Sequence, residues 1–230
     1  TTNVVCNGQN NGSLQVLPTG GTSPYTYLWS NTQTSQTISG LTAGTYTVTI
    51  TDNMGCTLVS SSTVSQPTSL TSSISASTNV SCNGGNNGSA TVSASGGSPS
   101  YNYLWSNTQT TATATNLIAG TYTVTVTDSH SCTSISNITI TQPTAVSATT
   151  SGTSVSCNGG NNGTASVNPT GGTPGYTYLW SNTVTTSSIT GLTAGTYSVT
   201  VKDANNCSTV VSYTVSQPTL LTASISSPTQ

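Results

Sequence analysis

The chain has 230 residues, and only five of them are Lys, Arg, Asp, Glu or His. They comprise one Lys or Arg, three Asp or Glu and one His, and the net charge is −2. Without a basic patch it has no means of neutralising phosphates, which excludes nucleic-acid binding. It also lacks a Lys/Arg cluster and an apolar run of about 18 residues, so we expect no direct membrane insertion.

Thr and Ser make up roughly two fifths of the chain, and the apolar fraction is low. Such a composition occurs in disordered chains, but disorder also requires a high net charge, which is missing here. We therefore expect a folded protein. Because so little charge repulsion separates its copies, lateral self-association into fibres is also expected.

Three tandem repeats organise the sequence. CNGQNNGS at 6–13 returns as CNGGNNGS at 82–89 and CNGGNNGT at 157–164, and an exit motif [ST]QPT ends at residues 68, 144 and 219. This spacing predicts domains at 1–67, 68–143 and 144–218, followed by a segment 219–230 that is an entering strand for a further repeat or a donor strand for a neighbouring subunit.

Each repeat then contains the hexapeptide YLWSNT, at 27–32, 103–108 and 178–183, which holds its single tryptophan. A small domain needs large apolar side chains, so we predict that these indoles form the cores. The alternative is that they face outward and stack on sugar rings. The tryptophans are Trp29, Trp105 and Trp180.

The next motif, TYTVTITD at 45–52, alternates apolar and hydroxyl residues with period two, as a half-buried strand does. With Asn-Gly and Gly-Gly turns between such runs, this predicts an all-β fold of three small antiparallel β-sandwich domains. The tyrosine that opens this strand resembles a tyrosine corner, and we assign it to the core. It is Tyr46, Tyr122 or Tyr197 in the three repeats. The cysteine that follows comes ten residues later, not two, which puts strict immunoglobulin topology in doubt.

Six cysteines allow fifteen pairings. A constant separation of 50 within each repeat favours Cys6–Cys56, Cys82–Cys132 and Cys157–Cys207. Metal binding is the weaker alternative, because there is no C-x-x-C motif and only one histidine. Disulfides imply an oxidising, extracytoplasmic setting.

The residue inventory argues against an enzyme and against a cofactor. His130 is the only candidate general base, it occurs in one repeat, and it stands in a turn. One aspartate precedes the second cysteine of each repeat, where an Asx turn explains it better than a calcium site, which needs more oxygen ligands. These aspartates are Asp52, Asp128 and Asp203.

An N-x-[ST] pattern recurs at Asn11, Asn87 and Asn162. These asparagines are candidate glycosylation sites, although Asn-Asn-Gly also simply makes a tight turn. O-linked sugar on the threonine rows is the second way in which this could be a glycoprotein.

Together these motifs resemble the SprB-type repeat, and more distantly PKD-like sandwich domains. They are CNG-x-NNG-[ST], YLWSN, AGTY-x-V-x-[VI]-x-D, the following cysteine and [ST]QPT. The resemblance covers nearly the whole chain. It implies an immunoglobulin-like or PKD-like fold in an extracellular, cell-surface protein of the kind that includes the gliding-motility adhesins of Bacteroidota, with no catalytic or ligand residue to carry over.

The repeats are out of phase with the ends of the sequence. Residues 68–79 and 144–154 alternate like a strand entering the second and third repeats, whereas the first repeat lacks such a strand. We predict partners of the same kind, namely further repeats in the same chain or copies added head to tail by strand exchange. The predicted function is a stalk or filament of an adhesin. The alternative is a carbohydrate-binding module that holds a surface polysaccharide on Tyr and Thr faces.

Overall fold

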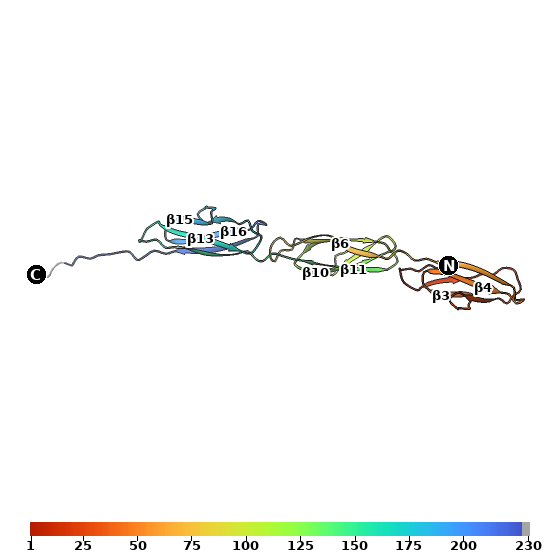
Figure 1. Cartoon of the computed structure of the whole chain (residues 1–230). Helices are drawn as coiled ribbons and strands as arrows, with labels where there is room; N and C mark the ends of the chain where they lie inside the picture. Colours follow the sequence, from red (N-terminus) through yellow and green to blue (C-terminus); the bar gives the residue numbers. More distant parts are fainter. Residues whose placement is uncertain (227–230) are drawn as a thin grey trace. The chain divides into compact units, whose positions relative to one another are not determined.

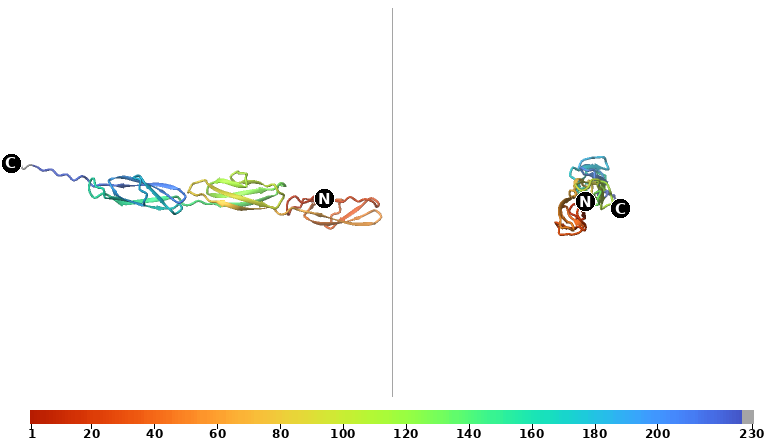
Figure 2. Two further views of the ribbon diagram at one scale, coloured as in Figure 1. Left: turned by 90° about the horizontal axis from the view of Figure 1, so that it is seen from above. Right: turned by 90° about the vertical axis from the view of Figure 1, so that its right-hand side faces the viewer.

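A computed structural model describes residues 1–226, and in this part of the chain the ribbon consists of strands and loops (Figures 1 and 2). The first repeat contributes β1 (Gly12–Gln15), β2 (Thr26–Trp29), β3 (Thr37–Leu41), β4 (Gly44–Thr51) and β5 (Thr57–Val64). The second contributes β6 (Thr71–Thr78), β7 (Gly88–Ser95), β8 (Asn102–Trp105), β9 (Thr113–Leu117), β10 (Gly120–Thr127) and β11 (Thr133–Ile140). The third contributes β12 (Ser147–Thr153), β13 (Gly163–Thr170), β14 (Thr177–Trp180), β15 (Ser188–Leu192), β16 (Gly195–Lys202) and β17 (Ser208–Val215).

The chain divides into two compact units, and each contains one outer repeat and part of the middle one. Unit 1 is Thr1–Ser77, Ala90–Thr115 and Thr121–Thr139, and unit 2 is Thr78–Ser89, Asn116–Gly120 and Ile140–Gln230. The domain boundaries at 67/68 and 143/144 fall between strands and stay a prediction. Of the segment 219–230, residues 227–230 lie outside the described residues.

Each complete repeat is built from two antiparallel three-stranded sheets. In the third repeat the strand orders are β12-β13-β15 and β14-β16-β17, and the second repeat has the same pattern with β6-β7-β9 and β8-β10-β11. Lettered by position, these are the orders A-B-E and C-F-G of an immunoglobulin sandwich without its fourth strand D. The doubt raised by the cysteine spacing is thereby removed, and the fold is immunoglobulin-like.

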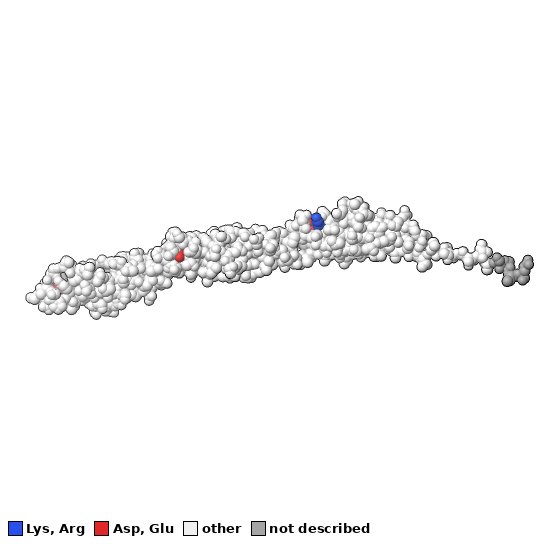
Figure 3. Space-filling model, turned by 180° about the vertical axis from the view of Figure 1, so that it is seen from behind, with Lys and Arg blue, Asp and Glu red and all other residues white. Residues whose placement is uncertain are grey.

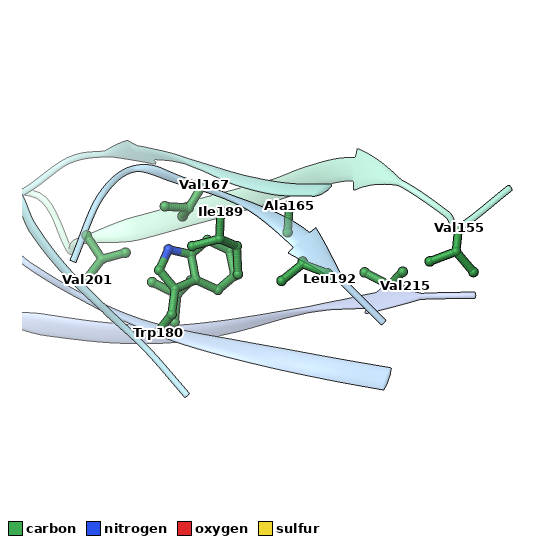
Figure 4. Close-up of a cluster of buried hydrophobic side chains, with 9 residues drawn as sticks. Val155, Ala165, Val167, Trp180, Ile189, Leu192, Val201 and Val215 are labelled. Carbon is green, nitrogen blue, oxygen red and sulfur yellow. The ribbon is translucent and has the colours of Figure 1, made fainter. Parts of the chain in front are cut away.

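Side chains from both sheets form one core in the third repeat (Figure 4). The Trp180 indole is 1% exposed and lies beside Val167 and Ile189 of the opposite sheet. Val199 stands two residues after Tyr197, where an immunoglobulin domain has its second core cysteine, and is fully buried. An aliphatic contact thus replaces the disulfide inside this sandwich.

The tryptophans predicted as core residues are all buried: Trp29 is 4% exposed, and Trp105 and Trp180 are each 1% exposed. Each indole N–H donates to a backbone carbonyl six residues later, at 2.9–3.0 Å. The buried polar group is therefore satisfied, as a buried indole requires. The tyrosine corner is present where Tyr46 and Tyr197 each donate to a carbonyl four residues upstream, at 3.1 Å.

The entering strand completes the first sheet of the second and third repeats. β12 pairs with all eight residues of β13 except Gly163, and also lies alongside β17. In the first repeat the described residues offer only an isolated bridge, Thr2 to Ser13, at the equivalent place, and β1 is only four residues long. The division into repeats, with a first repeat that has no entering strand of its own, stays a prediction.

Candidate functional site: the ends at which repeats are joined

A clamp of side-chain amides ties the start of each repeat to its exit. In the first repeat, Gly8 N–H donates to Gln66 Oε1 at 2.8 Å, and Asn7 Nδ2 donates to the Pro67 carbonyl at 2.9 Å. The same pair of bonds recurs in the other repeats. The CNG turn and the QPT exit are therefore neighbours at one end of each repeat. The sequence placed these glutamines only at the exit from a strand and did not reveal their side-chain role.

The aspartate turn organises the F–G connection of each repeat. Asp203 accepts N–H bonds from Asn205 and Cys207 on Oδ1 at 2.9 Å, and Oδ2 accepts one from Thr173 N–H at 2.8 Å. The Thr173 bond is the largest influence on the carboxyl and lowers its pKa. The Asx turn predicted for this position is confirmed.

The other two aspartates have the same arrangement. The Thr22 N–H bond, followed by that of Cys56, lowers the pKa of Asp52. Burial acts to raise the pKa of Asp128, but the N–H bonds from Ser98, Cys132 and His130 outweigh it, so that this pKa is also lowered. These carboxylate oxygens accept hydrogen bonds from backbone N–H groups. Residues 1–226 hold no cluster of three His, Cys, Asp or Glu side chains suited to a metal ion.

The disulfides join consecutive repeats and not the two ends of one repeat. Cys6 bonds to Cys132 with the Cα atoms 5.7 Å apart, and Cys82 bonds to Cys207 with a Cα–Cα distance of 5.5 Å. Among the described residues Cys56 and Cys157 are free and exposed. The predicted pairs Cys6–Cys56, Cys82–Cys132 and Cys157–Cys207 are therefore wrong.

The length of strand G, which is β5 in the first repeat, is the physical reason that the two cysteines of one repeat do not bond to each other. Cys56 immediately precedes β5, and the far end of β5 meets the CNG turn through the Val4 N–H bond to the Ser65 carbonyl, at 2.9 Å. Eight residues of β-strand span about 26 Å. A disulfide requires Cα atoms within about 7 Å. The two cysteines of one repeat stand at opposite ends of the sandwich and cannot bond to each other, and the four bonded cysteines pair between repeats.

A spacing signal for this pairing was present in the sequence. The cross-repeat separations, 126 and 125, are nearly as constant as the separation of 50 within a repeat. Recognising 57–64 as one uninterrupted strand would have excluded the shorter pairing.

The entering segment sits on the Gly-Gly turn of its own repeat. Gly97 N–H donates to the Thr68 carbonyl and Gly172 N–H to the Thr144 carbonyl, both at 2.9 Å. A Cβ atom on Gly172 would lie 2.5 Å from Cγ2 of Val146 and 2.6 Å from an Asp203 oxygen. The glycines, which also have positive φ, leave room for an apolar side chain next to the aspartate turn. Leu70 has the same place beside Gly97.

The remaining sequence candidates lie at these same ends. Asn87 Oδ1 accepts from Ser81 N–H, and its Nδ2 donates to Ser81 Oγ at 2.7 Å, so this amide closes the CNG loop. Asn11 and Asn162 make the same Oδ1 bond in their repeats, and glycosylation of these asparagines stays a prediction. His130 is exposed in the aspartate turn.

Figure 3 shows how few charges the surface carries: isolated coloured atoms stand on an otherwise uncharged face. Within residues 1–226 there is no helix with the length and apolar character needed to traverse a bilayer.

Comparison with solved structures finds remote likeness only. The eight N-terminal Ig domains of Down Syndrome Cell Adhesion Molecule are 11% identical over 91% of this chain, with a TM-score of 0.39, and this chain spans 34% of that structure. Drosophila OTK extracellular domains 3–5 give 12% identity, 95% coverage of both chains and a TM-score of 0.29. The amphioxus IgVJ-C2 molecule gives 16% identity, coverage of 60% of this chain and 100% of that one, and 0.30.

At such TM-scores these likenesses carry no argument, and the fold assignment rests on the strand order. No curated protein matches the sequence. The family comparison is specific: the model of the SprB repeat matches residues 1–34, 74–110 and 149–185, once in each repeat. The chain thus carries three copies of the SprB repeat.

Proposed function

We propose that this chain is a non-enzymatic structural segment, part of a stalk or filament that extends an adhesin from the bacterial cell surface. The observation that carries the proposal is that consecutive repeats are linked twice. The main chain passes from one repeat to the next through the QPT exit, and a disulfide joins the CNG turn of the earlier repeat to the aspartate turn of the later one.

A second covalent link restricts what a single linker would leave free. One peptide connection allows two domains to rotate and bend about it, whereas two connections anchored in ordered turns limit both motions. The anchors are ordered by the amide clamp on the CNG side and by the carboxylates of Asp128 and Asp203 on the other. This arrangement suits a protein that transmits force along its repeats.

The setting follows from the same bonds. Disulfides persist in oxidising compartments and are rare in the cytosol. A hydroxyl-rich surface with few charges lacks the positive charge that attracts nucleic acid or anionic lipid. An extracellular location at the cell surface, and service in gliding motility in particular, are parts of this proposal.

The carbohydrate-binding alternative has less support from the side chains. Stacking on a sugar ring needs an aromatic face open to solvent, and each of the three tryptophans and ten tyrosines in residues 1–226 is buried or half-buried. Tyr101 and Tyr176 are further committed to Gly-Gly turns through hydroxyl bonds to the carbonyls of Gly96 and Gly171. We therefore favour the structural function.

Stretching single molecules from both ends tests the mechanical part. With both disulfides closed, the shortest covalent path between the termini runs through both of them and contains about 81 residues, so the chain should extend to roughly 28 nm. After reduction it should reach roughly 80 nm. Full extension of the oxidised chain would contradict the doubly linked arrangement.

Labelling of intact cells tests the location. An antibody against the repeats should decorate unbroken bacteria that express the parent protein, and the label should extend away from the envelope. Signal only after lysis would refute the cell-surface proposal while leaving the fold unaffected.

A further inference from the structure

Two cysteines are free among the described residues, and each occupies a position that is bonded in the other repeats. Cys56 stands in the aspartate turn, where the second and third repeats have the bonded Cys132 and Cys207. Cys157 stands in the CNG turn, where the first two repeats have the bonded Cys6 and Cys82. Their freedom therefore does not come from a different local sequence.

The turn that holds Cys56 is already formed for a disulfide. Cys56 N–H donates to Asp52 Oδ1 at 2.8 Å, and the corresponding distances at Cys132 and Cys207 are both 2.9 Å. Asp52 N–H also donates to the Cys56 carbonyl at 3.0 Å, as in the other two repeats. The cysteine is thus presented as its bonded counterparts are.

The surface beside Cys56 is open at the place that the entering segment covers in the other two repeats. A Cβ atom on Gly20 would meet nothing within 4 Å, whereas the counterparts Gly96 and Gly171 are covered by the backbone carbonyls of Ser69 and Ala145. A cavity of about 280 Å³ remains there. Its lining includes Leu17, Tyr25, Ile50, Cys56 and Leu58. An apolar side chain on an extended segment would fill it, as Leu70 and Val146 do in the other repeats.

The other half of the junction is also present in this chain. The CNG turn of Cys157 carries the same clamp as the bonded turns, because Gly159 N–H donates to Gln217 Oε1 at 3.0 Å. Two residues after its QPT motif comes Leu221, the counterpart of Leu70 and Val146, and it is 94% exposed. At this end of the third repeat, Cys157 is therefore free and the Leu221 side chain is exposed.

We propose that Cys56 and Cys157 each form a disulfide with a further SprB repeat. Cys56 bonds to the CNG-turn cysteine of one further repeat. The segment that follows the QPT motif of that repeat places an apolar residue in the open cavity beside Cys56. Cys157 bonds to the aspartate-turn cysteine of another repeat, which receives Leu221. This inference rests on the proposed stalk function, and it extends the two observed disulfides into a continuous series.

The reaction is ordinary thiol oxidation. Two thiols lose two protons and two electrons, an S–S bond forms, and the electrons reduce a disulfide of glutathione or of a thiol–disulfide oxidoreductase to two thiols. Both cysteines are exposed, which gives such an oxidant access to them.

The partner repeat has two sources with the same chemistry, a neighbour in the same polypeptide or a second copy of this chain. In the second case the bond is Cys157 of one copy to Cys56 of the next. Denaturing the native parent protein without reductant, alkylating it and digesting it with pepsin distinguishes them. Pepsin is needed because a single lysine leaves trypsin almost nothing to cut.

The expected result is that peptides containing Cys56 and Cys157 are disulfide-bonded and not alkylated. A parent mass that is unchanged by reduction assigns the partner to the same polypeptide, and a mass that falls assigns it to another copy. Recovery of both cysteines in alkylated form would overturn the proposal. Cys6–Cys132 and Cys82–Cys207 could still be intact in that case, so that the stalk function would survive.

The 230-residue chain itself gives a second test. Equal amounts of Cys56→Ser and Cys157→Ser, which carry one free thiol each, are mixed and oxidised with glutathione disulfide. If the cavity beside Cys56 receives the segment that follows Cys157, the mixed Cys157–Cys56 dimer should be at least about tenfold more abundant than either symmetric dimer. Random pairing, in which half the dimers are mixed, would contradict it.

Leu221→Asp in the Cys56→Ser partner should slow formation of the mixed dimer at least several-fold, because the cavity is apolar. The matched control is Leu220→Ser, which restores the residue type found at Ser69 and should leave the rate unchanged. Equal rates for the two variants would remove the cavity from the proposal.

Discussion

The first and third repeats share their motifs, yet their first sheets differ. β13 has eight residues and pairs with a strand on each side, whereas β1 has four residues and one strand partner. Proline is not the cause, because Pro18 and Pro169 occupy equivalent positions and Pro169 lies within β13, opposite Ala148. The difference is the entering strand. Strand length in this fold is set by the partner strand and not by the local sequence.

A consequence is that a repeat does not supply its own complete sandwich edge from the CNG motif onward. In the second and third repeats, β6 and β12 supply this edge by pairing with β7 and β13. The bounds predicted from the sequence, 68–143 and 144–218, place this strand with the repeat that follows it, and they stay a prediction.

Core truncation should give the largest effect and should separate the two repeats. Trp180→Ala is expected to cost about 3–5 kcal/mol, since it empties a closed core. Trp29→Ala should cost less, because Trp29 adjoins a cavity open at the unpaired edge. Hydrogen exchange of β16 and β4 amides measures each loss locally. Leu179→Ala, at an exposed position of the same strand, is the control, and equal losses for the two tryptophans would undermine the comparison.

Removal of one disulfide should be next in size. The double change Cys82→Ser and Cys207→Ser opens a loop of 125 residues and should destabilise by roughly 2–4 kcal/mol in urea titrations. Cys157→Ser is the matched control, and it should have no effect in the 230-residue chain because that cysteine has no partner there. A destabilisation by the control variant as large as that of the pair would mean that the third repeat uses Cys157 in some other way.

Supplying the missing strand should make the first repeat resemble the third. A peptide with the sequence of residues 68–79 should bind the edge of β1 and protect its amides from exchange, without affecting β13. At a hundred times its dissociation constant it would stabilise the first repeat by about 2.7 kcal/mol. A peptide carrying Ile74→Asp should fail, because that residue is half-buried in β6. Protection of neither repeat, or of both, would show that the edge of β1 does not specifically accept a strand of this kind.

Acid should have the smallest effect. The pKa values of Asp52, Asp128 and Asp203 are lowered in the folded chain, so the stability they contribute is present above the ordinary aspartate pKa, near 4, and is lost as the pH falls through the folded values. The melting temperature should be flat from about pH 5 to 8 and should decline only below about pH 4. Asp203→Asn should melt lower at pH 7, because an amide cannot accept all three N–H bonds. A steep transition above pH 5 would contradict this assignment.

Much of the fold could be predicted because it depends on local signals. Period-two alternation identified the strand that became β4, and the rare Trp29 and its counterparts identified the cores. The disulfides could not be predicted in the same way. Both candidate separations are nearly constant from repeat to repeat. The choice depends on whether Cys56 and Cys6 stand at the same end of a sandwich or at opposite ends, which is a tertiary property. The amide clamp, in which Asn7 donates to the Pro67 carbonyl and Gln66 accepts from Gly8, was missed for a similar reason, since exposed amides acquire partners only when distant turns meet.

The staggered disulfides also determine what a protease can do to this chain. Cys6–Cys132 spans the first part of the sequence, Cys82–Cys207 spans the second, and the two spans overlap. Any single peptide bond cut between Cys6 and Cys207 therefore falls inside at least one closed covalent loop. Both fragments stay in one molecule after such a cut, and separating them requires either a second cut or a reductant.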